Sequence, residues 1–378
     1  MIGGAYKRYM RLIESMIEKG WNVFHISPSG FNNIKNSSLI HYSTYDIPIK
    51  PRFLVFYPQA LFVLLCLKRK NVKIDAIITF SSLENLIALA YKNIDKDVKV
   101  ILSVRGDSLS GYLITYNSFF IKKLFIYLFL IIDKLSLLNS DLIIFVSNYN
   151  KEINIKRLKP KNTQNFIVVH NDMHLQIFPE EEGQCIEIPQ NTVLIGFIGN
   201  LFSKGKGIEQ LIYAYLKIRI NIPNSQLIIV GDGPDKDFLH SLVTSLHLEN
   251  NIIFTGYQKN VKKYIEKCSL IVLPSLHEGL SNVLLEAIYL DIPVIGSNVG
   301  GNPEILKYED LMFDPTDNDK LCEKILLILT NDDYYQKIKS LIRERRQHFN
   351  FDWSENMIEK INNCIEKGNC INHKFDNK

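Results

Sequence analysis

The sequence has no uninterrupted run of about 20 apolar residues, the length that a membrane-spanning helix needs. Two segments come near it. Residues 53–67 are interrupted by Pro58 and end in a basic triplet, and residues 124–132 are too short and follow Lys122 and Lys123. We therefore predict a pair of buried helices here. The alternative is a basic and aromatic surface that rests on a membrane.

Paired cysteines and a strong net charge are also missing. The six cysteines are scattered without a pairing pattern, which predicts a reducing compartment. Cys364, Cys370 and His373 lack a second pair of ligands at zinc-like spacing, so we expect no metal there. The net charge of +4, from 44 basic and 40 acidic residues, is too small to indicate a nucleic-acid partner. It fits a weakly basic face near a membrane or an anionic substrate.

What the 378 residues do contain is a regular alternation of short apolar runs with amphipathic ones, over a length that suits two domains. This alternation predicts an α/β protein with parallel sheets. The acidic residues 179–184 lack periodicity and are the expected linker. Helical runs are expected at residues 83–91, 119–138 and 351–366, and strands at 23–26, 76–80, 98–104, 142–146, 193–198, 227–230, 252–254, 270–273 and 294–295.

The first residues form a glycine-rich turn at Gly3 and Gly4, followed by an apolar helical face that Gly20 closes. In a doubly wound sheet such a turn follows the first, central strand. No strand pattern precedes Gly3 in this sequence. We expect that the true start lies upstream of Met1, or that the chain is a truncated product.

The most informative segment is residues 274–304. Glu278 lies in a loop after an apolar run, and Glu286 follows it in a helix-like run. Their offset is slightly more than two helical turns, so both carboxylates can face one pocket. The loop at 279–282 presents backbone N–H groups at a helix N-terminus, which favours a phosphate. Such a pocket suits two hydroxyl clusters joined by a diphosphate, the outline of a nucleotide sugar. A solvated pair of glutamates is the simpler alternative, but the apolar neighbours of Glu286 predict burial.

Two glycine-containing loops follow strands earlier in this half. Residues 199–207 open a helix and carry Lys206, which can neutralise a diphosphate leaving group. Lys204 is an alternative register, and a solvated helix residue is the simpler alternative for either lysine. Gly231 and Gly233 precede Pro234 without the third glycine of a dinucleotide fingerprint, which disfavours a pyridine-nucleotide dehydrogenase.

Two Asp-x-Asp triplets, at residues 235–237 and 317–319, follow Pro234 and Pro315. Both positions suit helix caps and first-turn charges. We predict capping at both, and no metal requirement.

These motifs resemble glycosyltransferase family 4, the retaining glycosyltransferases of the "group 1" type. The resemblance rests on residues 274–304, with support from residues 199–207, 231–234 and 254–257. It implies an α/β, GT-B fold: two Rossmann-like, doubly wound domains facing a cleft. The implied boundaries are an acceptor-side domain at 1–178 that lacks its first strand, a nucleotide-sugar-binding domain at 190–350, and a C-terminal helix with a polar tail at 351–378 that crosses back.

The resemblance also implies roles by position. In the catalytic set, Glu278 would hold the donor sugar near its anomeric carbon, Lys206 would stabilise the departing diphosphate, and Asp107 would contact the acceptor. Glu286 would hold the ribose hydroxyls. The other implied donor-binding residues are Gly4, Arg105, Asn200, Gly231, Tyr257, Leu280, Ser281, Asn282 and Val283.

Three positions depart from the family pattern. Asn200 stands where the family usually has Arg. Lys206 would therefore have to supply more of the positive charge that stabilises the diphosphate. Arg105 stands where His is common; it can clamp a phosphate or polarise an acceptor but cannot act as a base at neutral pH. His174 stands where Asp is usual, and we expect it to have a packing role.

The implied activity is transfer of a sugar from a nucleotide sugar to a saccharide acceptor, expected to be lipid-linked, in bacterial surface-polysaccharide, lipopolysaccharide or capsule assembly. The expected partners are this donor, this acceptor and the inner-leaflet membrane surface, with no nucleic acid, cofactor or metal. The expected location is cytoplasmic, or peripheral on the inner face of the membrane. A catalytically silent nucleotide-sugar binder and a GT-B-like epimerase remain as alternatives, and the motifs do not identify the base, the sugar or the linkage.

Overall fold

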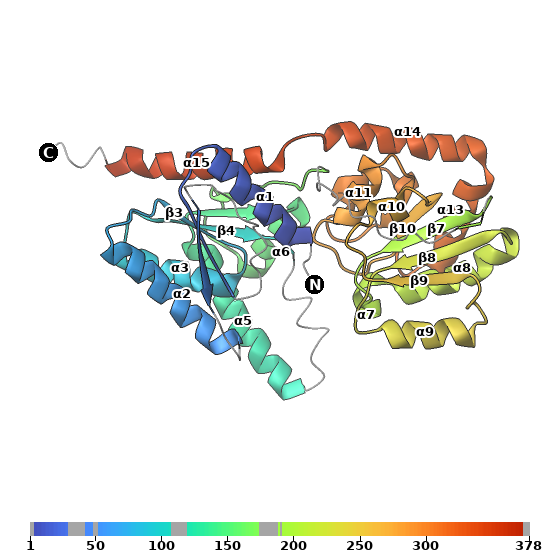
Figure 1. Ribbon diagram of the computed structural model, residues 1–378, viewed down its shortest axis with the longest axis horizontal. Coiled ribbons are helices and arrows are strands. Elements are labelled where there is room, and N and C mark those ends of the chain that lie inside the picture. Colours follow the sequence, from blue (N-terminus) through green and yellow to red (C-terminus); the bar gives the residue numbers. More distant parts are fainter. Residues whose placement is uncertain are drawn as a thin grey trace. The chain divides into compact units, whose positions relative to one another are not determined.

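The computed structural model describes residues 4–28, 42–47, 52–106, 119–173, 188–189 and 191–372. The chain divides into two compact units (Figure 1). The first unit comprises Met1–His170 and Asp352–Lys378, and the second unit comprises Asn171–Phe351. The expected linker at residues 179–184 lies outside the described residues.

The second unit is built on a parallel sheet of six strands in the order β12-β11-β10-β7-β8-β9. β10 and β11 are buried at every position and consist mainly of Leu, Ile and Val. Such runs are typical of parallel strands that helices cover on both faces. All five strands predicted for this half are confirmed. The strands are β7 Val193–Ile198, β8 Ser225–Val230, β9 Ile252–Gly256, β10 Leu270–Leu273, β11 Val294–Ser297 and β12 Met312–Phe313.

Helices connect these strands. The longer ones bury an apolar stripe; α8, for example, buries Leu211, Ile212, Tyr215 and Ile218. The helices of the unit are α7 Ser203–Lys206, α8 Ile208–Asn221, α9 Lys236–Ser245, α10 Lys262–Ile265, α11 Asn282–Tyr289, α12 Asn302–Leu306, η1 Glu309–Leu311, α13 Asn318–Thr330 and α14 Asp332–His348.

The order of the strands reverses at β7, which pairs with β8 on one side and with β10 on the other. In an open parallel sheet, the loops at the carboxyl ends of the strands diverge where the order reverses, and ligands bind there. The loops after β7 and β10 are therefore the first place to look for a site in this unit.

The first unit carries two parallel sheets, β1-β2 and β3-β4-β5-β6. In the part of the chain that the structure describes, no backbone pairing joins them. A doubly wound sheet has its first strand between its second and fourth, and here the described chain enters through helix α1. Ile26 of β1 and Ile77 of β3 nevertheless pack in one apolar cluster with Leu64, Tyr91 and Val98. The strands are β1 Val23–Pro28, β2 Tyr42–Ile47, β3 Ala76–Thr79, β4 Lys99–Val104, β5 Leu142–Phe145 and β6 Phe166–Val168.

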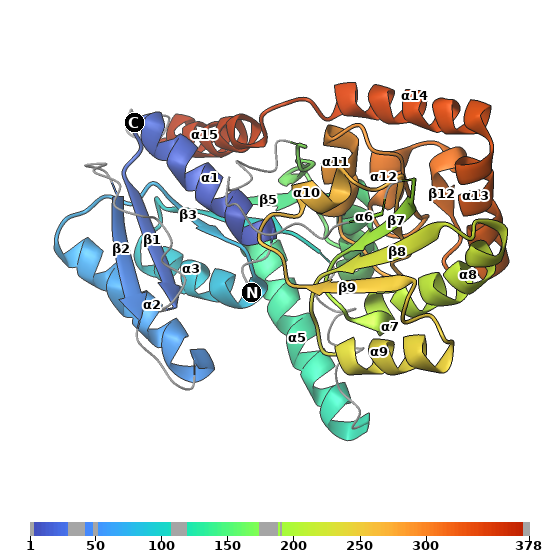
Figure 2. The ribbon, with the colours of Figure 1, turned by 45° about the vertical axis from the view of Figure 1, so that its right-hand side comes forward.

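In the described part of the first unit, six helices accompany these sheets. Helices α2, α3 and α5 lie side by side in that order (Figures 1 and 2). The C-terminal helix α15 packs on α1, where Arg11 Nε donates to Ser354 Oγ at 3.1 Å and Trp353 is fully buried. The helices are α1 Gly4–Glu18, α2 Arg52–Arg69, α3 Ser82–Ile94, α5 Phe119–Asn139, α6 Asn148–Leu158 and α15 Trp353–Asn372.

The helix predicted at residues 53–67 is present, because α2 runs from Arg52 to Arg69, and Pro58, which interrupts the apolar run, lies inside it. A proline removes one helical hydrogen bond. After Pro58, the buried stripe of Ala60, Leu64 and Leu67 holds the helix against the unit. Among the described residues, no helix is both long enough and apolar enough to cross a membrane.

Candidate functional site

Lys206 and Glu278 meet at the point where the strand order of the second unit reverses. Lys206 ends the short helix α7 after β7, and Glu278 lies in the loop after β10. Lys206 Nζ lies 2.5 Å from Glu278 Oε1, which also accepts a hydrogen bond of 2.8 Å from Ser275 Oγ. Only 10% of the Glu278 side chain and 28% of the Lys206 side chain are exposed. Lys204, the alternative considered from the sequence, is exposed.

Glycines let the backbones of neighbouring loops approach closely around this pair. A Cβ on Gly207, whose φ is +63°, would lie 2.0 Å from Pro274 O. A Cβ on Gly300, whose φ is +60°, would lie 1.9 Å from Glu278 O. Both positions therefore exclude any side chain, by conformation and by space. The loop that carries Glu278 is fixed from both sides.

The N-terminus of α11 follows the same loop. Ser281 is its N-cap and accepts a hydrogen bond of 3.4 Å from Leu284 N–H, and both Leu280 and Ser281 are buried. Asn282 Oδ1 accepts a hydrogen bond of 2.9 Å from Asn171 Nδ2, which positions the first turn. The helix N-terminus therefore begins beside Glu278, as the sequence predicts. Its backbone N–H groups and dipole favour an anion.

The sequence predicted a buried carboxylate at Glu286, and this is wrong. Leu284, Leu285, Ala287 and Ile288 are buried, but Glu286 itself is only half-buried, and so is Val283. On a helix that packs one stripe against the core, these two positions fall beside the stripe. Glu286 can therefore meet a ligand without the full cost of burying a charge.

Three further predicted residues lie on loops at the same edge of the sheet. Asn200 follows β7 and is exposed, and 45% of Tyr257, which follows β9, is exposed. Gly231 follows β8 with φ of +145°, where a Cβ would lie 1.8 Å from Gly199 O. Gly231 thus brings the loops after β7 and β8 together. In the described part of the chain, no hydrogen bond joins Tyr257 to Lys206 or Glu278.

The two aspartate triplets differ in what they cap. Asp317 caps α13 as predicted, accepting a hydrogen bond of 2.9 Å from Lys320 N–H. Asp235 precedes α9 but makes no cap bond to it; its carboxylate accepts from Ser203 N–H at 2.7 Å, at the start of α7. The expected helix start after Pro234 is confirmed, with Asp237 in the first turn of α9, but the side chain of Asp235 does not cap that helix. Its carboxylate stabilises the helix that carries Lys206.

In the first unit, Arg105 follows β4 and lies over aromatic rings. Its guanidinium carbon is 5.3 Å from the ring centre of Trp353 and 5.9 Å from that of Tyr9. Contacts of this kind with aromatic rings hold an arginine in place. Gly4 is the first residue of α1. Asp107 and His174 lie outside the described residues, so their predicted roles stay predictions.

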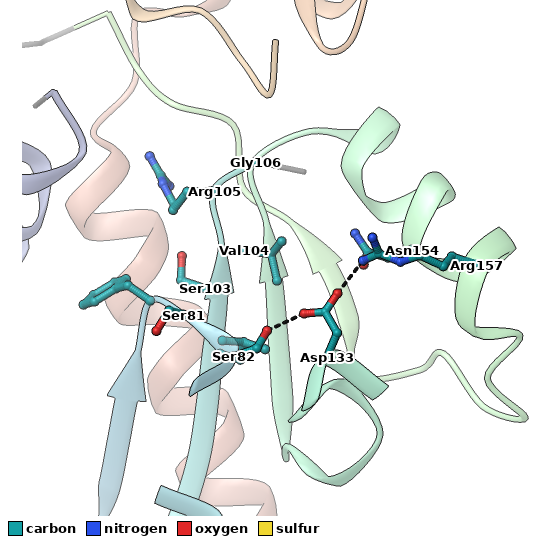
Figure 3. Close-up of a pocket in the computed structure, with 11 residues that line it drawn as sticks. Ser81, Ser82, Ser103, Val104, Arg105, Gly106, Asp133, Asn154 and Arg157 are labelled. Carbon is teal, nitrogen blue, oxygen red and sulfur yellow. Dashed lines mark hydrogen bonds and ion pairs between the residues drawn. The ribbon is translucent and has the colours of Figure 1, made fainter. Parts of the chain in front are cut away.

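A cavity of about 290 Å³ opens beside Arg105 (Figure 3). Five of its polar lining residues were missed from the sequence: Ser81 and Ser82 at the start of α3, Asp133 of α5, and Asn154 and Arg157 of α6. Asp133 stands in a helix that is otherwise strongly apolar, and this was the available signal. Nothing in the sequence indicated that α6 would face it.

Comparison with known proteins bears on the second unit first. Residues 180–345 match the family described as Glycosyl transferases group 1. This segment belongs to that family. It contains Lys206, Glu278 and Glu286. The pair at the point of strand-order reversal therefore lies inside the group 1 glycosyltransferase segment.

Curated relatives of this glycosyltransferase segment extend the likeness. N-acetyl-alpha-D-glucosaminyl L-malate synthase of Bacillus anthracis is 30% identical over 42% of this chain and 41% of its own length. The chain thus spans less than half of that relative. Protein CapJ of Staphylococcus aureus is 28% identical over 86% of this chain and 80% of its own. The N-acetylgalactosamine-N,N'-diacetylbacillosaminyl-diphospho-undecaprenol 4-alpha-N-acetylgalactosaminyltransferase of Campylobacter jejuni is 24% identical over 74% of each.

A solved structure matches nearly the whole chain. HepE of Anabaena, in complex with UDP, has a TM-score of 0.74 at 16% identity, over 96% of this chain and 97% of HepE. The likeness shows that the chain has the GT-B fold that the sequence predicted.

Proposed function

We propose that the chain is a retaining glycosyltransferase that moves a sugar from a nucleotide sugar to a saccharide acceptor. The observation that carries this proposal is the Lys206–Glu278 pair, which lies at the reversal point of the sheet and inside the group 1 segment. The two side chains hold each other before any ligand arrives, and Ser275 holds Glu278 as well. Preorganised charges of this kind contribute most to stabilising a transition state.

Lys206 is placed to stabilise the diphosphate that leaves when the glycosidic bond to the donor breaks. An ammonium group has three N–H donors, and Glu278 takes one of them. Two are left for phosphate oxygens, so Lys206 can hold the leaving group while it stays paired with Glu278. The N-terminus of α11 adds a second source of positive potential.

Glu278 and Glu286 are proposed to hold hydroxyl groups. Oε2 of Glu278 remains available for a hydroxyl of the donor sugar, because Oε1 accepts from both Lys206 and Ser275. Glu286, half-buried on α11, is proposed to hold the ribose. Hydrogen bonds to a carboxylate contribute about 1.5–3 kcal/mol each.

We propose that no metal ion takes part. Lys206 supplies the positive charge that a metal would bring to the diphosphate. The carboxylates of Asp235 and Asp317 are both engaged with backbone N–H groups. Addition of EDTA to dialysed protein should therefore leave the rate of transfer unchanged, and a loss that Mg²⁺ or Mn²⁺ restores would contradict this.

The acceptor is proposed to be a lipid-linked saccharide used in bacterial surface-polysaccharide assembly. The name of the Campylobacter jejuni relative specifies a diphospho-undecaprenol acceptor, which supports this class. Helix α5 supports it independently, because it exposes an apolar face formed by Tyr127, Leu128, Ile131, Leu135 and Leu138. We propose that this face rests on the inner leaflet of the cytoplasmic membrane.

The first test is calorimetric titration with UDP, GDP and ADP, beginning with UDP because HepE was solved with it. One nucleotide should bind clearly better than the other two. Lys206→Ala should weaken it about tenfold or more, since each charge-assisted bond is worth at least ~1.4 kcal/mol. Lys204→Ala, two residues away in the same helix and exposed, is the matched control and should bind like the unaltered protein. Absence of binding by all three nucleotides would refute the proposed function.

A further inference from the structure

A chain of buried hydrogen bonds leads away from Glu278 into the second unit. Ser275 Oγ donates to Glu278 Oε1 at 2.8 Å. Ser297 Oγ, from the last residue of β11, donates to Ser275 O at 2.5 Å, and Asn302 Nδ2, from the first residue of α12, donates to Ser297 O at 3.1 Å. Ser275, Ser297 and Asn302 are all fully buried. The carboxylate is therefore connected through two further side chains to the neighbouring strand and helix.

Ser297 holds the backbone at a point that the sheet does not reach. The pairing of β10 with β11 ends at Leu273 and Gly296. Ser275 lies two residues past that end, where the chain turns into the loop that carries Glu278. The hydroxyl of Ser297 bonds the carbonyl of Ser275 and so extends the connection between the two strands beyond their last paired residues.

This connection decides where the second oxygen of Glu278 points. Its first oxygen, Oε1, accepts from both Lys206 and Ser275. A lysine ammonium lies on a flexible stem and can follow a carboxylate that moves. The short side chain of Ser275 cannot, because its backbone is held by Ser297. Ser275 therefore fixes the direction of Oε2, the oxygen that is proposed to meet the donor sugar.

A fixed direction matters because many sugars differ only in the direction of one hydroxyl. A carboxylate that can turn accepts from either epimer, whereas a carboxylate held in one orientation leaves the wrong epimer with a poor hydrogen bond. Specificity is this difference between two affinities. It is large where a buried or half-buried polar group loses its partner with the wrong ligand.

The far end of the chain shows that stability alone does not explain it. Asn302 Oδ1 is buried and has no hydrogen-bond partner. Such groups are rare in native proteins because they destabilise the folded state. An apolar side chain would fill the same space without that cost, but it could not donate to Ser297 O. Local rules are typically broken in this way near functional sites.

We propose that Ser297 is a positioning residue that sets the donor-sugar selectivity of the transferase, by fixing the orientation of Glu278 through Ser275. Ser297 itself touches neither donor nor acceptor. The inference rests on the proposed function, in which Glu278 holds the donor sugar, and it adds what determines which sugar is accepted.

The test compares two serine variants of the full chain. Ser297→Ala removes the bond to Ser275 O. Ser225→Ala is the matched control, because Ser225 is also a buried serine of the second unit, and its Oγ donates to Ile222 O at 2.7 Å. Ser225, however, is the first residue of β8 and therefore lies at the opposite end of the strands. Each variant loses one buried hydrogen bond of the same kind, so urea unfolding should show similar losses of stability.

Calorimetry then measures affinity for the preferred nucleotide and for its derivatives with glucose, galactose, N-acetylglucosamine and N-acetylgalactosamine. These four ligands differ only in the sugar, so the ratio between the tightest and the weakest measures sugar selectivity. Ser297→Ala should lower this ratio about threefold or more, and it should change affinity for the free nucleotide by less than about twofold. Ser225→Ala should change neither.

Ser275→Ala shows whether Ser297 acts through Ser275. It removes the hydroxyl that contacts Glu278, so Ser297 then has no path to the carboxylate. Adding Ser297→Ala to Ser275→Ala should therefore lower the selectivity no further, whereas two independent effects would multiply. If Ser297→Ala does not fold, Ser297→Cys replaces it in every comparison, because a thiol is a weak hydrogen-bond donor of similar shape and should lower the selectivity in the same direction.

Three results would overturn the inference: unchanged selectivity in the Ser297 variant, an equal loss of selectivity in Ser225→Ala, or equal binding of all four derivatives by the unaltered protein. Failure of the proposed function looks different. In that case no nucleotide binds to the unaltered protein, and the inference falls with it. Clear nucleotide binding combined with any of the three results refutes the role of Ser297 and leaves the nucleotide site standing.

Discussion

Glu278 shows how much of the chemistry depends on one side chain and its supports. The carboxylate accepts from Lys206 and Ser275, and its backbone is held by the close approach of Gly300. Its orientation is therefore fixed by three different loops. The residue types around it were visible in the sequence, but their convergence depends on the order of strands in the sheet.

Glu278→Gln should separate binding from turnover. Glutamine still accepts from Ser275 but loses the ion pair with Lys206, and Glu278 is proposed to contact the sugar rather than the nucleotide. We expect nucleotide affinity to change by less than about threefold, and the rate of transfer to fall on the order of 10²-fold. Titration calorimetry and a product assay measure the two. Equal losses of nucleotide affinity and of transfer rate would show that Glu278 contacts the nucleotide rather than the sugar.

Glu84 in α3 predicts a pH dependence of stability. Burial raises the pKa of its carboxyl above the usual 4.5, although the Phe80 N–H that it accepts acts in the opposite direction. A carboxyl with a raised pKa in the folded state contributes stability that is fully present below its unfolded pKa and is lost as pH rises through the folded pKa. Glu84→Gln keeps an acceptor for Phe80 N–H and removes the buried charge.

We therefore expect Glu84→Gln to be more stable than the unaltered protein at pH 7, with the difference vanishing near pH 4. Urea unfolding at both pH values measures this. A variant that is less stable at pH 7 would show that the charged carboxylate contributes more through its hydrogen bonds than its burial costs.

At the scale of elements, α5 has its polarity reversed. It buries Asp133 and Ser136 and exposes Tyr127, Ile131 and Leu135, whose exposed fractions range from 40% to 64%. A helix of a water-exposed domain normally shows the opposite arrangement. The exposed face also carries Lys134. Apolar and basic residues on one face suit an anionic lipid surface.

Replacing Ile131 and Leu135 by serine should reduce binding to vesicles. We expect the unaltered protein to sediment with vesicles of phosphatidylglycerol and phosphatidylcholine more than with phosphatidylcholine alone, and the double variant to lose most of this binding. Phe238→Ser, which changes an exposed apolar residue of α9, is the control. Equal sedimentation of the double variant and the control would contradict the proposed membrane face.

The strands also show which parts of the fold can be predicted from sequence patterns. Buried parallel strands such as Leu270–Leu273 were predicted to the residue, because continuous apolar runs bounded by turns have few alternative structures. β2 was missed since its run Tyr42–Ile47 is largely polar, and β6 since it has only three residues. The cavity in the first unit was not predictable either. It depends on α5 and α6 facing the same strand ends, which no local pattern encodes.

At the scale of the whole molecule, the second unit is a continuous piece of chain and the first is not. Residues 171–351 contain a complete six-stranded sheet, and Met173 N–H donates to Phe349 O at 3.4 Å, so the ends of this piece meet. Compact units of this kind usually fold alone. The first unit, by contrast, includes α15 from the far end of the sequence, and Trp353 of this helix is fully buried.

A fragment of residues 171–351 should therefore unfold cooperatively in urea and bind the preferred nucleotide within about tenfold of the full chain. Circular dichroism and calorimetry test this, with Lys206→Ala in the fragment as the control for site-specific binding. A folded fragment that does not bind the nucleotide would show that essential nucleotide contacts lie in the first unit.

The glycines of the second unit limit the positions at which substitutions could change the donor preference. At Gly207, Gly231 and Gly300 the backbone of one loop occupies the space that a side chain would need. Saturation libraries at these codons would yield almost only misfolded protein. Variation at Asn200 and Tyr257, whose side chains are exposed, costs the fold little. Selection for an altered donor would therefore enrich changes at the rim and leave the glycine contacts beneath it untouched.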